Sequence, residues 1–462
     1  MQIDAVVVFG ATGDLARKML FPALYRLEER GELDQRIVGV ALDEWDLERF
    51  RRHVADAVGD AIGGADLPVL ERLVGRLGYV AGDYTGDRVF VGVREALGPG
   101  VRCLCYLAIP PSMFGTVVSG LQGVGLTDGA RILVEKPLGR DLAGARRLNR
   151  ILLSAVPEES IYRIDHFLGK EPIENLLAFR YANPVFEAVW NRSHIDHVQI
   201  TMAEAFGVDG RGALYDSIGV VRDVVQNHLL QVVSLLAMDA PAAPGAAAFD
   251  EARTRLLGAI PPIGAADVVF GQYRGYREVP HVAAGSTVAT FVALRLAIES
   301  PAWSGVPFFV RTGKELPVTA TEATVVFRQR PPLPFSSESL PPAANRLVFQ
   351  IGPSDGACLV VQTKQPGDGV RLSTARLSVD FERTFGRIPL AYERVISDAL
   401  RGDRSIFAGE RSVEEAWRIV AAIADPPDRP HVYEPGTWGP EEAAHLLGPT
   451  RAWADPDPTK QP

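Results

Sequence analysis

The chain of 462 residues has only three cysteines, Cys103, Cys105 and Cys358. An odd, sparse set argues against a disulfide framework and suits a reducing compartment, so we expect a cytoplasmic protein. Cys103 and Cys105 lie in the apolar segment VRCLCYLAIP. This segment predicts a buried strand that carries two core thiols, rather than a metal or redox pair.

Long basic runs and long apolar runs are also missing. The net charge is −9, and no cluster of lysine and arginine offers a surface for nucleic-acid phosphates, so we expect no nucleic-acid partner. No apolar run reaches the length of a membrane span, and the amino terminus shows no signal-peptide pattern. Because 47% of the residues are hydrophobic and 23% are charged, we expect a globular protein with a sizeable core.

The first part of the sequence alternates between apolar strands and segments of helical periodicity. Buried strands are predicted at residues 5–10, 36–42, 76–83, 102–110 and 131–138. Apolar runs with little alternation suit strands that are covered on both faces. Together with the intervening helices they predict a doubly wound parallel sheet, and therefore a Rossmann-like dinucleotide-binding domain at residues 1–165.

The character of the sequence changes after about residue 185. Several segments from here to residue 381 are β-rich and often alternate, which predicts a large, mostly antiparallel sheet. Residues 214–238 predict one or two helices between these strands. The fold class is therefore α/β followed by α+β, with a second domain at 166–450. We expect the tail, 451–462, to be disordered.

The first predicted strand ends in GATGDLA, residues 10–16. Gly10 permits a tight turn, Gly13 lets the backbone approach a pyrophosphate, and Ala16 is small enough for close helix–strand packing. Thr12 occupies the place of the second glycine of the G-x-G-x-x-G motif. At the first strand of a parallel sheet, this pattern favours nucleotide binding over a simple tight turn.

The end of the second strand indicates which dinucleotide binds. An acidic residue there bonds the 2′-hydroxyl of NAD, whereas an arginine accommodates the 2′-phosphate of NADP. The sequence has Leu42 and Asp43 at this place. The charge of Asp43 favours NAD, but an alternative of nearly equal weight is that Asp43 only caps the helix that follows.

The segment RIDHFLGKE, residues 163–171, places Lys170 four residues after His166. If a helix starts here, the two side chains share one face, and two cationic groups on one face attract an anion. Gly169 would let the backbone come close to that anion. Asp165 points away from His166 in extended backbone, so we expect it to serve a different partner.

Other charged residues stand at strand ends or within apolar segments. Lys136 follows a parallel strand at the edge where such sheets bind ligands, and Lys314 follows a predicted strand of the second domain. Glu204 lies in an otherwise apolar strand, where a surface carboxylate is the ordinary alternative. Asp223 and His228 lie in an apolar helix, where a lone histidine is more often a satisfied core residue than a base.

Two other patterns carry no chemistry. His194 and His197 would face opposite sides of a strand and have no cysteine or carboxylate cluster beside them, so we predict no metal site. No serine occupies a G-x-S-x-G turn, so nothing supports hydrolysis by a catalytic triad.

Together these motifs resemble the glucose-6-phosphate dehydrogenase family. The resemblance rests on segments in family order over nearly the whole chain: GATGDLA, AIPPS, EKPLG, RIDHFLGKE, GRGALYD, RDVVQNHLLQ, GVPFFVRTGKEL and GTWGP. It implies a Rossmann-like domain and a second domain for substrate binding and assembly, in a homodimer or homotetramer. The implied reaction oxidises glucose 6-phosphate at C1 to 6-phosphoglucono-1,5-lactone with NADP or NAD, in the first oxidative step of the pentose phosphate pathway.

The resemblance also implies roles for single residues. His228 would take the proton from the C1 hydroxyl, and Asp165 would bond its far ring nitrogen. The phosphate and the sugar would be bound by a set of charged residues, His166, Lys170, Glu204, Asp223, Lys136 and Lys314. The dinucleotide would contact Gly10, Thr12, Gly13, Asp14, Leu15, Asp43, Pro110 and Lys136.

Several positions depart from the family pattern. Phe167 stands in place of a tyrosine of the phosphate loop, and Thr319 in place of a second basic residue. Gly352 stands where a glutamine often precedes proline, Met19 where a lysine is common, and Leu42 where an arginine reads the 2′-phosphate. The loss of a charge-assisted contact weakens binding by about 1.5–3 kcal/mol. The sequence therefore leaves two properties undecided, the preferred sugar phosphate and the preferred cofactor. The alternatives are a dehydrogenase of another hexose 6-phosphate and a weakly active regulatory paralogue.

Overall fold

The computed structural model describes residues 2–334, 342–425 and 427–456. The chain divides into two compact units. The first comprises Met1–Gly169, Ala243–Asp250 and Pro389–Glu414, and the second comprises Lys170–Ala242, Glu251–Ile388 and Glu415–Pro462. This division differs from the predicted ranges 1–165 and 166–450, because two segments that come late in the sequence pack with the first unit.

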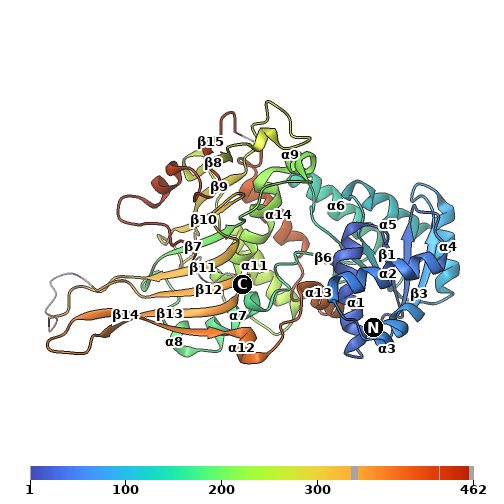
Figure 1. Cartoon of the computed structure of the whole chain (residues 1–462), viewed down its shortest axis with the longest axis horizontal. Helices are drawn as coiled ribbons and strands as arrows, with labels where there is room; N and C mark the ends of the chain where they lie inside the picture. Colours follow the sequence, from blue (N-terminus) through green and yellow to red (C-terminus); the bar gives the residue numbers. More distant parts are fainter. Residues whose placement is uncertain (1, 335–341, 426, 457–462) are drawn as a thin grey trace. The chain divides into compact units, whose positions relative to one another are not determined.

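The first unit is built on a six-stranded parallel sheet in the order β3-β2-β1-β4-β5-β6 (Figure 1). Its strands are β1 (Ala5–Phe9), β2 (Arg36–Ala41), β3 (Leu77–Ala81), β4 (Cys103–Leu107), β5 (Arg131–Val134) and β6 (Ile161–Arg163). The order reverses between β1 and β4, and sheets of this kind bind ligands at the carboxyl ends of their strands near that point. The predicted Rossmann-like fold is confirmed. Strand β6 was not predicted, because three residues are too few to show a period.

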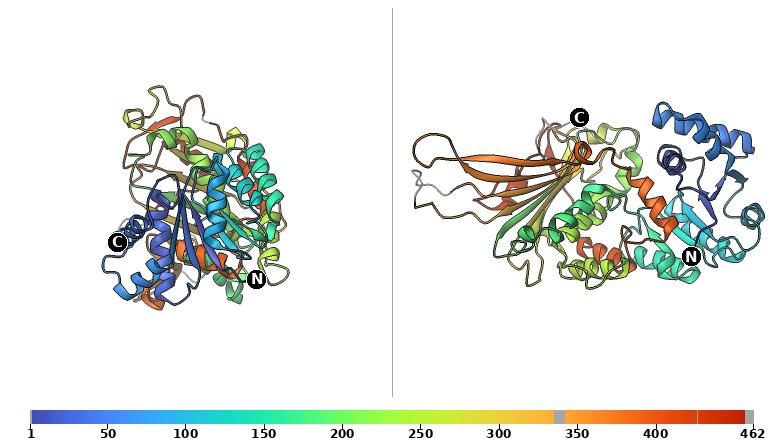
Figure 2. Two further views of the ribbon diagram at one scale, coloured as in Figure 1. Left: turned by 90° about the vertical axis from the view of Figure 1, so that its right-hand side faces the viewer. Right: turned by 90° about the horizontal axis from the view of Figure 1, so that it is seen from below.

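Helices lie on both sides of this sheet (Figure 2). They are η1 (Ala16–Leu20), α1 (Phe21–Glu29), α2 (Leu47–Ile62), α3 (Leu67–Gly75), α4 (Asp87–Leu97), η2 (Pro111–Met113), α5 (Phe114–Gly123), α6 (Leu142–Ala155), η3 (Glu158–Ser160) and α13 (Ala391–Arg401). Every residue of β1 and β4 is buried, as strands covered on both faces must be. Cys103 and Cys105 are buried free thiols of β4, as predicted.

The second unit is built on a nine-stranded sheet in the order β14-β13-β12-β11-β7-β10-β9-β8-β15. Its strands are β7 (Ile195–Ala203), β8 (Val268–Tyr273), β9 (Phe291–Leu296), β10 (Phe308–Gly313), β11 (Ala320–Phe327), β12 (Arg346–Gly352), β13 (Asp355–Lys364), β14 (Leu372–Asp380) and β15 (His431–Tyr433). Only the pairs β10–β7 and β15–β8 are parallel within the described sheet, so the predicted antiparallel character is confirmed. Strands β8 and β15 were not predicted.

Helices of the second unit precede the sheet in sequence, connect its strands or follow its last strand. They are α7 (Glu171–Tyr181), α8 (Pro184–Glu187), α9 (Gly212–Val220), η4 (Val221–Leu229), α10 (Leu230–Ala237), η5 (Ala265–Asp267), η6 (Tyr276–Glu278), α12 (Phe381–Phe385) and η7 (Glu441–Leu447). Two further helices, α11 (Ala246–Gly258) and α14 (Glu410–Val420), contain residues of both units. The helical stretch predicted at 214–238 is thus formed by α9, η4 and α10. No helix in the described ranges is both long and apolar enough to cross a membrane.

A buried arginine of the second sheet is held by the end of the chain. Arg311 on β10 is 1% exposed, and its guanidinium carbon lies 4.4 Å from the ring centroid of Trp438 and 4.6 Å from that of Trp453. The same group donates a 2.6 Å hydrogen bond to the carboxylate of Asp455. A buried charge without its partner is costly, so these contacts tie the last described residues to the sheet.

The tail that we expected to be disordered therefore begins with packed residues. The backbone N–H of Ala454 donates to the Gln199 side chain at 2.7 Å, and the guanidinium of Arg451 donates to Asp196 at 2.9 Å. The sequence pattern did not reveal these contacts, because their partners lie on β7, about 255 residues earlier. Residues 457–462 lie outside the described residues.

We expect Asp455→Asn to lower the free energy of unfolding by about 1–3 kcal/mol, because the buried Arg311 would keep its charge beside a neutral partner. Differential scanning calorimetry of the full chain measures this. Glu434→Gln is the control, since the Glu434–Arg274 pair, at 2.7 Å, is exposed on both sides. Equal melting temperatures for wild type and Asp455→Asn would contradict the role of this contact.

Candidate active site

The glycine turn after β1 is fixed by close contact with neighbouring strands. Gly10 has a φ of 80°, and a Cβ atom at this position would lie 2.2 Å from the carbonyl oxygen of Ala108, which follows β4. The Gly10 N–H lies 2.8 Å from the Val40 carbonyl and 2.9 Å from the Tyr84 hydroxyl. Only glycine tolerates this approach, so the turn is set by the sheet itself.

The residues after this turn lead directly into a helix. Leu15 already has helical dihedral angles, with φ −63° and ψ −46°. The first N–H groups of a helix have no partner within it, and the helix dipole adds positive potential there. The loop Gly10–Leu15 thus has the geometry of an anion-binding turn, and this fits the pyrophosphate of a dinucleotide.

Asp43, which follows β2, is joined to the glycine turn. Its carboxylate accepts a 2.6 Å hydrogen bond from the Thr12 hydroxyl, and its backbone carbonyl accepts one from the Tyr79 hydroxyl at 2.5 Å. Helix α2 is capped by Asp46, whose side chain accepts from a backbone N–H of the first turn. The alternative that Asp43 only caps this helix is therefore wrong. The neighbouring Leu42 is 64% exposed.

Two buried acids follow the adjacent parallel strands β5 and β6. Glu135 accepts hydrogen bonds from the hydroxyls of Tyr106, at 2.5 Å, and Tyr392, at 3.2 Å. Burial raises the pKa of the Glu135 carboxyl, and the hydrogen bonds from both tyrosines oppose that rise. Asp165 accepts a 3.0 Å hydrogen bond from the N–H of Phe167. Lys136 stands directly after Glu135, at the carboxyl edge of the sheet.

The loop that contains His166 rests on the start of α13. The ring of His166 lies 6.2 Å from that of Tyr392, with the two planes 17° apart. A Cβ atom at Gly169 would lie 3.1 Å from the carbonyl oxygen of Ala391. The side of Gly169 where a Cβ would stand is thus packed against α13. Helix α7 begins only at Glu171, so His166 is not on one helical face with Lys170.

In the second unit, a buried lysine lies between two carboxylates. Strands β7 and β10 are parallel and in register at Ala203 and Gly313, so the residues that follow them adjoin. Lys314, which is 4% exposed, pairs with Glu204, and its ammonium lies 3.8 Å from the carboxylate of Asp223. This cluster offers hydrogen-bond donors and acceptors side by side, as a polyhydroxylated ligand requires.

Asp223 and His228 lie on the π-helix η4. In such a helix the N–H of residue i+5 bonds the carbonyl of residue i, so the two residues are one turn apart, and single π-turns are frequent at functional sites. His228 is buried. The five-residue spacing did not reveal this relation, because on an ordinary α-helix the neighbours are three or four residues apart.

Lys170 directly precedes α7, and its side chain reaches the end of β12. Its ammonium donates to the carbonyl of Ile351 at 3.4 Å, and a Cβ atom at Gly352 would lie 3.3 Å from it. Gly352 therefore leaves room beside this cation. Thr319, the other departure from the family pattern in this unit, accepts a 3.0 Å hydrogen bond from the N–H of Ala205.

Asp355, which sequence reasoning missed, begins β13 opposite Ile351. Burial raises the pKa of this carboxyl to about 6, with Glu382 and Asp380 adding to the rise and Lys170 opposing it. This carboxylate thus lies near Lys170 and near other acidic groups. No motif indicated Asp355, since the residues that surround it come from separate elements.

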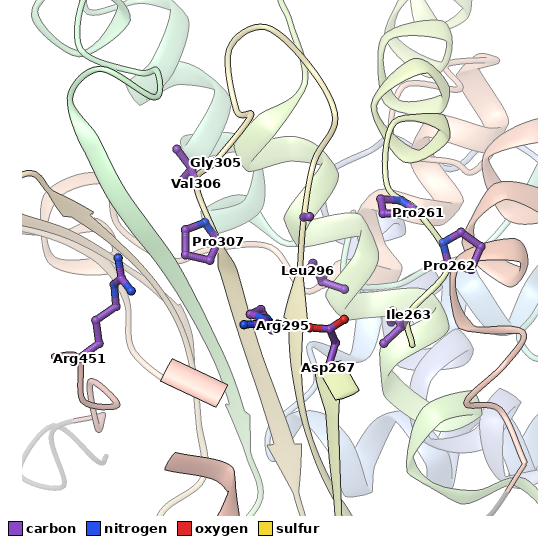
Figure 3. A pocket seen from close by; sticks show the side chains of 11 residues that line it. Pro261, Pro262, Ile263, Asp267, Arg295, Leu296, Gly305, Val306, Pro307 and Arg451 are labelled. Carbon is purple, nitrogen blue, oxygen red and sulfur yellow. Dashed lines mark hydrogen bonds and ion pairs between the residues drawn. The ribbon is translucent and has the colours of Figure 1, made fainter. Parts of the chain in front are cut away.

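A separate pocket of the second unit has a volume of about 470 Å³ (Figure 3). It lies between the loop at Pro261–Ile263, the ends of β8 and β9, and the residues that precede β10. The side chains of Asp267 and Arg295 point toward one another and are ion-paired at 2.6 Å. None of the residues that line it belongs to the predicted site.

Comparisons with known proteins cover nearly the whole chain. The family model "Glucose-6-phosphate dehydrogenase, NAD binding domain" matches residues 7–175, and "Glucose-6-phosphate dehydrogenase, C-terminal domain" matches residues 177–454. Glucose-6-phosphate 1-dehydrogenase 1 of Mycobacterium tuberculosis is 42% identical over 98% of this chain and 96% of its own.

Two solved structures are similar over the same length. The glucose-6-phosphate 1-dehydrogenase of Mycobacterium avium has a TM-score of 0.92 and 43% identity, covering 98% of this chain and 99% of its own. A glucose-6-phosphate dehydrogenase in complex with its substrate glucose 6-phosphate has a TM-score of 0.90 and 33% identity, covering 97% and 98%.

The raised pKa of Asp355 predicts a pH-dependent stability. The folded value of about 6 exceeds the ordinary value of 3.8, so folding binds a proton between these pH values. The wild type therefore loses stability as the pH rises through this window, and Asp355→Asn does not. The gain of the variant in urea unfolding should be larger at about pH 7.5 than at about pH 4. The exposed Asp368→Asn is the control, and a gain independent of pH would refute the assignment.

Proposed function

We propose that this chain, which belongs to the glucose-6-phosphate dehydrogenase family, oxidises the C1 hydroxyl of D-glucose 6-phosphate to 6-phospho-D-glucono-1,5-lactone. The observation that carries the proposal is the cluster of Lys314, Glu204 and Asp223, with the buried His228 one turn from Asp223 on η4. Lys314, Asp223 and His228 fall within the family segments, and together with Glu204 they combine a base with groups that bind sugar hydroxyls.

In the proposed mechanism, the imidazole of His228 takes the proton of the C1 hydroxyl. A histidine suits this role, because its ordinary pKa of about 6.5 leaves it largely neutral at the pH of the cell. Asp165 bonds the other ring nitrogen, which fixes the tautomer and stabilises the imidazolium as it forms. The burial of both residues supports this assignment, since a buried carboxylate and imidazole each need a partner.

A set of charged residues holds the substrate in this proposal. Glu204 and Asp223 accept hydrogen bonds from sugar hydroxyls, while Lys314 donates to them. The ammonium of Lys170 and the ring of His166 bind the 6-phosphate, and Lys136 orients the sugar. With Phe167 in the phosphate loop and space beside Lys170 at Gly352, the phosphate has fewer donors than the family pattern provides.

In this proposal the dinucleotide is held by Pro110 and by the loop after β1. The loop residues that hold it are Gly10, Thr12, Gly13, Asp14 and Leu15. The tight turn at Gly10 fits this role, since it presents backbone to a pyrophosphate. A dinucleotide held there would supply the acceptor for the hydride of C1, and Lys136 would help to hold its nicotinamide end.

We also infer a preference for NAD over NADP. The carboxylate of Asp43 is held at the turn by Thr12, where it can accept a hydrogen bond from a 2′-hydroxyl and would repel a 2′-phosphate. Of the cationic residues after the turn, Arg17 is paired with Asp60 at 2.6 Å and Lys18 with Asp14 at 2.8 Å.

Assembly and location follow the same family expectation. We propose a homodimer or homotetramer built through the large sheet, whose edge strand β14 exposes Leu377 and Val379. Three buried free thiols suit the reducing cytoplasm in which we place the protein.

His228→Ala should lower kcat for glucose 6-phosphate oxidation by about 10²–10⁴-fold, because the proton would have no base. Binding of glucose 6-phosphate, followed by calorimetric titration, should change little. His281→Ala is the control, since this histidine is exposed in the same unit. Turnover that is undiminished in His228→Ala would remove this residue from the mechanism.

The cofactor preference is tested by changing the residues at the end of β2. Wild type should have the higher kcat/KM with NAD, and Leu42→Arg with Asp43→Ser should shift the NAD to NADP ratio by about tenfold or more toward NADP. Asp46→Asn keeps a helix cap and is the control. A strong NADP preference of the wild type would contradict the role of Asp43, whereas absence of any turnover would contradict the reaction.

A further inference from the structure

We infer that Tyr392 is a positioning residue for the sugar-phosphate site. Its hydroxyl positions Lys136 through Glu135, and its ring contacts the ring of His166 directly. The inference rests on the proposed function, because that function gives Lys136 and His166 their roles. Tyr392 lies more than 220 residues after both of them in the sequence, and no motif of the chain includes it.

Tyr392 reaches this place because α13 is anchored to the first unit at both ends. Near its start, the fully buried carboxylate of Glu393 pairs with Arg30 at 2.5 Å. Near its end, the guanidinium of Arg131 donates to the carbonyls of Ala399 and Leu400, each at 2.7 Å. Arg131 is the first residue of β5, so the helix is tied to the strand that leads to Lys136.

The hydroxyl of Tyr392 acts on the end of β5. It donates to Glu135 at 3.2 Å, and the hydroxyl of Tyr106 donates to the same carboxylate oxygen at 2.5 Å. A buried carboxylate needs such donors, because it has lost its hydrogen bonds to water. Removing the hydroxyl of Tyr392 would leave Glu135 underbonded and free to shift, and Lys136 is the next residue in the chain.

The ring of Tyr392 acts on the loop after β6. It lies nearly parallel to the ring of His166, 6.2 Å away, and limits the orientations that the imidazole can take. The loop cannot move toward α13, because Gly169 already lies against the backbone of Ala391. One side chain thus contacts both the ring of His166 and the carboxylate of Glu135, the residue that precedes Lys136.

The two contacts can be separated by substitution. Tyr392→Phe removes the hydroxyl and keeps the ring, so we expect kcat to fall about fivefold to fiftyfold with little change in the KM for glucose 6-phosphate. Tyr392→Leu removes both, so the KM should also rise, by about tenfold. Tyr25→Phe is the matched control, since this buried hydroxyl of α1 accepts a 2.7 Å hydrogen bond from the N–H of Asp66, just before α3.

A double-mutant cycle distinguishes positioning from a merely structural role. If the hydroxyl acts through Lys136, then Tyr392→Phe should reduce kcat much less in the Lys136→Ala background than in wild type. Thermal unfolding of each variant identifies any that fail to fold, and Glu135→Gln, which keeps the shape of the acceptor, then takes the place of Tyr392→Phe. An unchanged kcat in Tyr392→Phe, or equal losses in both backgrounds, would overturn the inference. A wild type without activity would refute the proposed function instead.

Discussion

The buried ammonium of Lys314 is the constraint on which the second unit depends. A charge that is 4% exposed must be compensated where it lies, and Glu204 and Asp223 do this from two different elements. The compensation requires β7 and β10 to run parallel and in register, so that Glu204 and Lys314 leave their strands together. Two strands, a π-helix and a salt bridge therefore define one cluster, which we propose to bind the sugar.

In the first unit, tertiary contacts likewise fix the residues at the carboxyl edge of the parallel sheet. There, Gly10 closes against Ala108, Asp43 bonds the turn, and Glu135 is satisfied by two tyrosine hydroxyls. The second of those hydroxyls belongs to α13, which returns to this unit late in the sequence. The proposed dinucleotide loop and the residues that we assign to the phosphate and sugar thus depend on tertiary contacts as much as on the motifs that contain them.

Local patterns in the sequence predicted the parts of this fold that have a period or a motif. The strands that precede Gly10, Lys136 and Lys314 are apolar runs that end in a glycine or a charged residue. The first sheet was predicted to be parallel and the second mostly antiparallel, and both are. Strands β6 and β15 have three residues each and were missed, because so short a run has no period. The family resemblance, rather than periodicity, gave the roles of the site residues.

Contacts between distant segments could not be predicted. Asp43 bonds Thr12, 31 residues away. The next helix is capped by Asp46, although capping by Asp43 was an alternative of nearly equal weight. Tyr392 bonds Glu135 across 257 residues, and Trp453 packs on Arg311 although its segment has the composition of a disordered tail. Each of these depends on where the chain returns, which composition and spacing do not encode.

In the function that we propose, the site selects the C1 hydroxyl of glucose 6-phosphate. The most direct test is a steady-state comparison of glucose 6-phosphate with mannose 6-phosphate, galactose 6-phosphate and unphosphorylated glucose, each with NAD and with NADP. The account predicts that glucose 6-phosphate has the highest kcat/KM, by about tenfold or more, and that its product is the 1,5-lactone. A higher kcat/KM for another hexose 6-phosphate, or no turnover with any of them, would contradict it.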